Sequence, residues 1–328
     1  MTLFRRRALA AIALPLLAIA AAPAKAQGDW PAGRPMTWVV PYPPGGTTDI
    51  LGRAIALRLG ASLGATLVVD NKAGATGTIG SAFVARAAPD GYTLLGTSIG
   101  PQAIVPNLVP KMQYDPIKAF EPVALIGTIP HMLVVGSSQP FRSVRELVEQ
   151  AKAQPDTLSF ASGGTGTILQ MQGELLRLQT GARMTHVPYK GDTPAIQDVL
   201  AGHATFMFAP VAAALPHIQG GRLRALAVTS SARLKALPDV PTMGQAGFKD
   251  FVVEQWQAVY APAGTPAAVV QRLNQEIVRI LKDPEVAAMA DRFGITLVGS
   301  TPQQLADTQK ADLAKWGRVI KDAGVRMD

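Results

Sequence analysis

WVVPYPPGGTTD, residues Trp38–Asp49, carries a strand end, a stiff loop and a helix start in one short stretch. An apolar run ends at Val40, prolines and two glycines form a turn, and the helical pattern ILGRAIALRL follows Asp49. Such a loop presents free backbone N–H groups at the positive end of a helix dipole, where an anion is stabilised. Because no nucleophile or set of metal ligands lies beside it, the stretch indicates binding rather than catalysis.

The same unit of strand, Gly/Thr-rich loop and helix recurs at 158–178, with the loop sequence SGGTGT. Elsewhere short apolar runs, such as the predicted buried strand 66–69, alternate with helical patterns. This alternation is typical of an α/β fold in which mainly parallel sheets are flanked by helices.

Two longer extended runs, 122–135 and 251–261, are interpreted as crossover strands between two domains. They predict one domain built from 27–127 and 254–328, and a second from 128–253. The two Gly/Thr loops would then face a shared cleft, the usual place for a ligand in such folds.

The first 26 residues are predicted to be a signal peptide. Its positive region is Arg5–Arg7, its apolar core 8–22, and its cleavage site Ala24-Lys25-Ala26, so the mature chain is expected to begin at Gln27. The apolar core is shorter than a typical membrane helix, and we expect no stable membrane insertion. The expected location is the periplasm, and the arginines leave Sec and twin-arginine export both open.

Composition excludes several classes of function. The chain has no cysteine, which excludes disulfides, thiolate chemistry and a lipid-modified cysteine. Removing the four basic residues of the signal from the formal net charge of +8 leaves +4. That surplus contains no basic block, so no nucleic-acid partner is expected, whereas a mild positive field suits small anionic ligands.

Five ordered motifs resemble the periplasmic solute-binding proteins of tripartite tricarboxylate transporters, the Bug/TctC-like family. They are VVPYPPGGTTDILGR, DNKAGATGTIGSAFVARAAPDGYTLL, THVPYKGDTPAIQDVLAG, LPHIQGGRLRALAVTS and LPDVPTMGQAGF. The resemblance runs from end to end. It implies a two-domain flytrap fold that captures a small di-, tri- or aromatic carboxylate for delivery to membrane permease subunits. We expect a monomer without enzymatic activity, metal or cofactor.

Carried over by position, the resemblance implies two pincer loops whose backbone N–H groups and threonine hydroxyls donate to the ligand. The expected ligand-binding residues are Tyr42, Pro44, Gly45, Gly46, Thr47, Thr48, Asp49, Ser98, Ser162, Gly164, Thr165, Gly166, Thr167, Tyr189, Lys190 and Ala209.

Three of these assignments, and the role of the neighbouring Asp192, keep open questions. Asp49 either contacts ligand or stabilises its helix through the dipole, and Lys190 is either a ligand-facing cation or a solvated loop residue. Ala209-Pro210 stands where the family often has a polar pair, which predicts a drier wall and a more apolar ligand body. Asp192 caps the helix predicted to start at Thr193-Pro194, pairs with Lys190, or receives a ligand ammonium group.

Two other functions stay open. Ser98 lies in GTSIG, a G-x-S-x-G pattern that would suit a secreted serine hydrolase, but Pro101 and Pro106 interrupt the helix that a nucleophile elbow requires, and no acid–histidine pair is evident. A ligand-sensing subunit of a signalling system would carry the same motifs. The four histidines lack the spacing of a zinc site.

Overall fold

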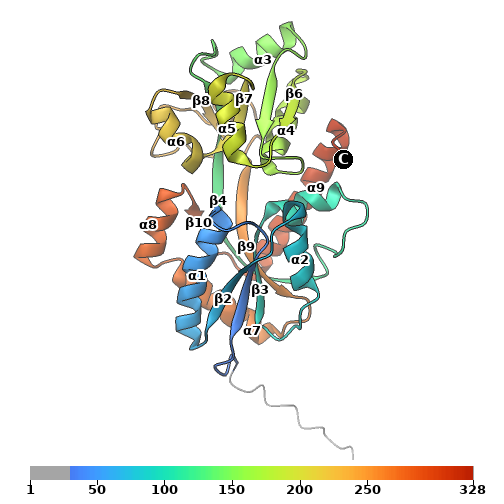
Figure 1. Ribbon diagram of the computed structural model, residues 1–328, viewed down its shortest axis with the longest axis vertical. Coiled ribbons are helices and arrows are strands. Elements are labelled where there is room, and N and C mark those ends of the chain that lie inside the picture. The colour runs from blue at the N-terminus through green and yellow to red at the C-terminus, as the bar shows by residue number, and fades with distance from the viewer. Residues whose placement is uncertain (1–29, 328) are drawn as a thin grey trace, which may run out of the picture.

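The structure is a computed structural model that describes residues 30–327, so the predicted signal peptide lies outside the described residues. The chain forms two lobes, one above the other in Figure 1, each with a sheet flanked by helices. Two long strands, β4 (Phe120–Gly136) and β9 (Glu254–Pro262), run between the lobes. The α/β class and the crossover strands are confirmed, whereas the exact domain limits stay a prediction.

The first lobe contains a sheet with the strand order β2-β1-β3-β9-β4, and β10 pairs with β4 at its edge. β1 is parallel to β2 and β3, whereas β9 is antiparallel to β3 and β4. The strands are β1 (Met36–Val40), β2 (Leu67–Asn71), β3 (Thr93–Ser98) and β10 (Thr296–Leu297). The helices of this lobe are α1 (Thr47–Leu63), α2 (Thr78–Ala85), α7 (Ala267–Ile280) and α8 (Pro284–Arg292).

The second lobe contains a sheet with the order β4-β7-β5-β6, and β8 also pairs with β4. β5 is parallel to β6 and β7, and β4 is antiparallel to β7 and β8. The strands are β5 (Ser159–Ser162), β6 (Thr185–Pro188), β7 (Phe206–Pro210) and β8 (Leu223–Val228). The helices are α3 (Val144–Ala153), α4 (Ile168–Thr180), α5 (Asp192–Ala201) and α6 (Val211–Gln219).

β4 belongs to both sheets. Its residues 120–130 pair with β9, and from His131 onward it pairs with β7. The last helix, α9 (Pro302–Ala323), packs against β4 and against α4 of the second lobe. The C-terminal helix therefore contacts both lobes, although the sequence assigned it to the first alone.

Two local expectations were wrong. β2 is an edge strand, and Val68 is 53% exposed, because only β1 pairs with it. α5 begins at Asp192 rather than after Thr193, because Gly191, at φ 114°, ends the preceding turn and serves as the N-cap. The second difference matters for the site, since it places Asp192 in the first turn of the helix.

Gly96 is predicted to be intolerant of any side chain. It lies on β3 beside the fully buried Trp38 of β1, and a Cβ there would overlap the indole ring. Overpacking of a filled core costs 1–3 kcal/mol, so Gly96→Ala should lower the free energy of unfolding by about 2 kcal/mol. Urea unfolding measures this, with Gly244→Ala, at an exposed turn glycine, as the control. Equal losses in the two variants would contradict the packing explanation.

Candidate functional site

A cavity of about 510 Å³ lies between the lobes. The first residues of three α-helices line its wall, namely Thr47 and Thr48 of α1, Ile168 and Leu169 of α4, and Asp192 of α5. Each helix follows a parallel strand through a short loop, so the strand ends and helix starts of both lobes meet here. The two units predicted from the sequence therefore supply α1 and α4, two of these three helix starts.

The first loop is held in shape by the buried carboxylate of Asp49. Its Oδ2 accepts hydrogen bonds from the Gly45 N–H (2.9 Å) and from Arg53 Nε (3.0 Å), and Oδ1 accepts one from Asn71 Nδ2 (2.9 Å). Asn71 also donates to the Tyr42 carbonyl. Burial alone would raise the pKa of Asp49, but the bonds from Arg53, Gly45 and Asn71 outweigh it and hold that pKa below its usual value. Asp49 therefore supports the loop from behind.

The second loop is held by the side chains of Ser162 and Gln170. Ser162 Oγ lies 2.7 Å from His186 Nε2 and accepts the Gly164 N–H, while Gln170 Oε1 accepts the Gly166 N–H. Thr167 caps α4 by accepting the Gln170 N–H, and its hydroxyl donates to the Gly164 carbonyl at 2.7 Å. Burial, together with the positive charge of Arg177, lowers the pKa of His186 to about 4. His186 is therefore a neutral structural group at neutral pH.

Tyr42 and Ser98 meet at the cavity wall, where their hydroxyl oxygens are 2.7 Å apart. Burial raises the pKa of Tyr42 to about 12, so its phenol is neutral. Within the described part of the chain, no histidine lines this cavity and none bonds to Ser98. The geometry thus gives Ser98 a hydrogen-bonding role and no base that would activate it as a nucleophile.

Half of the expected residues line the cavity, namely Tyr42, Pro44, Gly46, Thr47, Thr48, Ser98, Gly166 and Thr167. The others do not line it: Gly45, Asp49, Ser162, Gly164, Thr165, Tyr189, Lys190 and Ala209. The N–H groups of Gly45 and Gly164 already donate to side chains of their own loops. The Thr48 and Thr167 hydroxyls likewise donate within the protein, Thr48 to Gln257 Oε1 at 2.9 Å.

In the turn after β6, Gly191 lines the cavity but Tyr189 and Lys190 do not. Tyr189 donates its hydroxyl to Asp198 (2.5 Å), and burial together with that carboxylate raises the pKa of Tyr189 to about 12. Lys190 is exposed, as its solvated alternative predicted. Ala209 is buried within β7, while its neighbour Pro210 lines the cavity and supplies the apolar wall expected for this position.

Several lining residues were missed from the sequence. Ile129 and Gln255 are paired across β4 and β9, where they reach the cavity from the crossover strands. Ile168 and Leu169 open α4, and Thr76 comes from the turn before α2. Their proximity depends on how the lobes meet, so no local pattern signals it. For Ile168 and Leu169, their position directly after the second loop was an available clue.

The cavity favours an anion by means of helix ends rather than cationic side chains. Among its lining residues in the described range there is no lysine, arginine or histidine. No side chain caps the N-terminus of α1, so N–H groups of its first turn remain available to a ligand, whereas α5 opens with the carboxylate of Asp192. Such groups, together with the helix dipole, bind carboxylates and phosphates.

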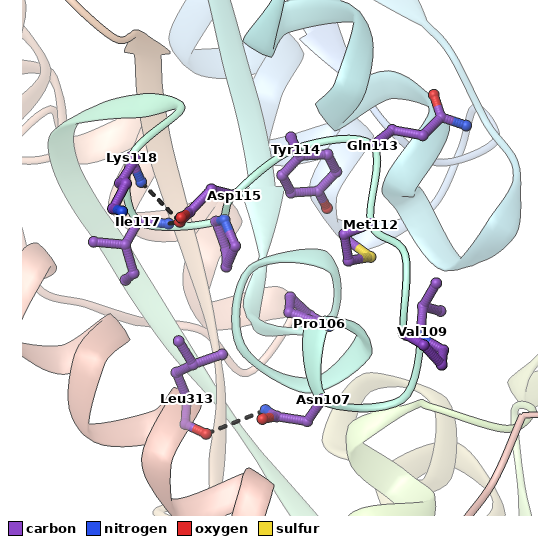
Figure 2. Close-up of a pocket in the computed structure, with 12 residues that line it drawn as sticks. Pro106, Asn107, Val109, Met112, Gln113, Tyr114, Asp115, Ile117, Lys118 and Leu313 are labelled. Atoms are coloured by element: carbon purple, nitrogen blue, oxygen red, sulfur yellow. Dashed lines mark hydrogen bonds between the residues drawn. The ribbon is translucent and has the colours of Figure 1, made fainter.

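A second hollow, of about 780 Å³, lies on the outside of the first lobe between the loop 106–118 and α9 (Figure 2). Polar side chains at its wall form hydrogen bonds within the protein. Asn107 Nδ2 donates to the Leu313 carbonyl, and Asp115 Oδ1 accepts the N–H groups of Ile117 and Lys118. No α-helix of the described residues begins at its wall, so the smaller cavity between the lobes is the candidate site.

Two further searches concern residues 30–327 only. None of the helices there combines the length and apolarity needed to cross a membrane. Within the same range, histidine and acidic side chains form no cluster of three or more that would suit a metal ion.

Comparison with known proteins decides the family. Residues 51–325 match the model described as "Tripartite tricarboxylate transporter family receptor". The chain belongs to this receptor family. This chain is 37% identical to the protein BugT of Bordetella pertussis over 322 residues, which cover 98% of each chain.

Solved structures agree with the receptor assignment. The periplasmic binding protein BugD superposes with a TM-score of 0.77 at 35% identity, covering 90% of this chain and 99% of the other. Rpa4515 of R. palustris, solved with adipate, superposes with a TM-score of 0.80 at 35% identity, covering 90% of this chain and 99% of the other. MatC of Rhodopseudomonas palustris, solved with malate, superposes with a TM-score of 0.77 at 32% identity, covering 88% of this chain and 99% of the other. The receptor family consists of periplasmic solute-binding proteins rather than enzymes.

Proposed function

We propose that this protein captures a small organic acid in the cavity between its lobes and delivers it to the membrane subunits of a tripartite transporter. The observation that carries the proposal is the meeting of three helix N-termini at one cavity without a cationic side chain among its described lining residues. A carboxylate bound there accepts hydrogen bonds from backbone N–H groups in a partly dehydrated site.

The size and wall of the cavity support a small ligand with an apolar body. A volume of about 510 Å³ lies in the range of small-molecule sites. Ile99, Ile129 and Leu169 contribute apolar surface between the polar loops. The adipate and malate found in two solved relatives are small organic acids, and adipate has an apolar hydrocarbon chain.

Delivery requires that the loaded form differ from the empty one. β4 and β9 are the strands that run between the lobes, so we propose that bending at these strands closes the lobes on the ligand. The closed form would present the surface that the permease recognises. The proposed working place is the periplasm, after removal of the signal peptide.

A ligand screen tests the binding step. We expect a mono-, di- or tricarboxylate, an aromatic acid or an amino acid to raise the melting temperature and to give a heat of binding in titration calorimetry. The carboxamide of each hit, which keeps the shape and loses the charge, should bind at least about tenfold more weakly because charge-assisted hydrogen bonds are lost. Failure of every acid to bind, or a co-crystal with the acid outside the cavity, would overturn the proposal.

The transport step needs a cellular test. Deleting the gene should abolish uptake of the radiolabelled hit, and the wild-type gene should restore it. Normal uptake combined with a lost transcriptional response to the same acid would instead favour the sensor alternative.

A further inference from the structure

Asp192 brings a carboxylate to the wall of the binding cavity. It is the first residue of α5, and its Oδ1 lies against the second loop, where a Cβ on Gly163 would overlap it. No residue within 30–327 donates a hydrogen bond to this carboxylate or forms an ion pair with it. Partial burial raises its pKa, and no neighbouring cation lowers that pKa again.

No charge of the described wall compensates Asp192. It is the only acidic residue lining the cavity in the described range, and the wall there contains no cationic side chain. Lys190, two positions earlier, is exposed and forms no ion pair with it among the described residues. A hydrogen-bond donor for this carboxylate therefore comes from water in the empty cavity, and a ligand that displaces this water must supply the donor itself.

The parts of the cavity wall near α1 and near Asp192 consequently favour ligand groups of opposite charge. The uncapped first turn of α1 favours a negative group near Thr47 and Thr48. A carboxylate partly removed from water at the other side disfavours a second negative group and favours a positive one. A dianion would satisfy only one of these two parts, whereas an acid with a protonated amine satisfies both.

We propose that Asp192 receives a protonated amino group of the ligand, so that the cavity prefers an amine-bearing carboxylate to the amine-free acid of the same length. This inference rests on the proposed function and names the ligand class of the same site. The competing role for Asp192 is structural: an acid in the first turn of a helix also stabilises that helix through its dipole.

Matched ligand pairs distinguish the two roles. The probes are L-aspartate with succinate, L-glutamate with glutarate, and L-2-aminoadipate with adipate, and any other acid that binds is paired with its own amine-bearing or amine-free analogue. Titration calorimetry with the wild type, Asp192→Asn and Asp239→Asn gives the dissociation constants. Asp239 is an exposed acid of the same lobe that does not line the cavity, so its variant controls for loss of one negative charge.

The wild type and Asp239→Asn should bind one amine-bearing acid at least about tenfold more tightly than its amine-free partner. In Asp192→Asn the ratio of these two dissociation constants should fall by about ten- to hundredfold, so that the preference is lost. Wild-type binding of the amine-free acids with equal or greater affinity overturns the inference. A preference that survives in Asp192→Asn also overturns it, and a lower melting temperature in that variant would then assign Asp192 to helix stability. If no acid of any kind binds, the proposed function itself fails, which is a separate result.

Discussion

Gly46→Val is expected to weaken binding of the organic acid at least about hundredfold while leaving the fold intact. Gly46 is the N-cap of α1 and lines the cavity. Its backbone is extended (φ −76°, ψ 166°), so valine fits without strain, and a Cβ there meets only the Pro43 carbonyl oxygen at 3.9 Å. The branched side chain would stand beside the free N–H groups of Thr47 and Thr48 and keep a carboxylate from reaching them.

Calorimetry with the acid found in the screen measures this loss, and circular dichroism with urea unfolding checks the fold. Gly244→Val, at an exposed turn in the second lobe, adds the same side chain away from the cavity and should keep wild-type affinity. An unchanged dissociation constant in Gly46→Val would remove the first loop from the binding site. Equal losses in both variants would show that the added side chain acts through the fold.

The loops of this site could be predicted because their signals are local. Prolines and glycines after an apolar run, followed by a helical pattern, specify strand, turn and helix whatever surrounds them. This is why the unit at 38–59 and its counterpart at 158–178 correspond to β1–α1 and β5–α4. The crossover strands could also be predicted from the sequence, because a strand that pairs in two sheets, as β4 does, requires a long extended run of residues.

The roles of single residues could not be predicted in the same way, because they depend on partners far along the chain. Thr48 is next to the loop in sequence, yet its hydroxyl donates to Gln257 on β9. Tyr189 has the right residue type for a ligand contact but donates to Asp198 instead. Ile129 and Gln255 carry no motif and become neighbours only when β4 and β9 pair. Tertiary contacts, absent from any local pattern, decide these cases.

Asp49 shows how such a residue can still matter for binding, and Asp49→Ala is expected to lower the free energy of unfolding by about 3 kcal/mol. The substitution leaves the Gly45 N–H without its acceptor and removes the partner of Asn71 and Arg53. Because Asn71 also holds the Tyr42 carbonyl, both ends of the first loop would loosen. We therefore expect weaker ligand binding as well, although Asp49 does not line the cavity.

The effect should depend on pH with a definite sign. The folded-state pKa of Asp49 is held below its usual value, so the carboxylate stabilises the fold fully above the unfolded-state pKa of about 4. That contribution is lost as the pH falls through the lowered folded-state pKa. Urea unfolding at pH 7 and pH 3 should show a smaller gap between wild type and Asp49→Ala at pH 3. Asp70→Ala on β2, which removes a partly exposed ion pair with Lys72 just after the strand, should cost less than about 1 kcal/mol. A gap that stays constant with pH would mean that the loss arises from packing rather than from the ionised carboxylate, and the loop would then not depend on this charge.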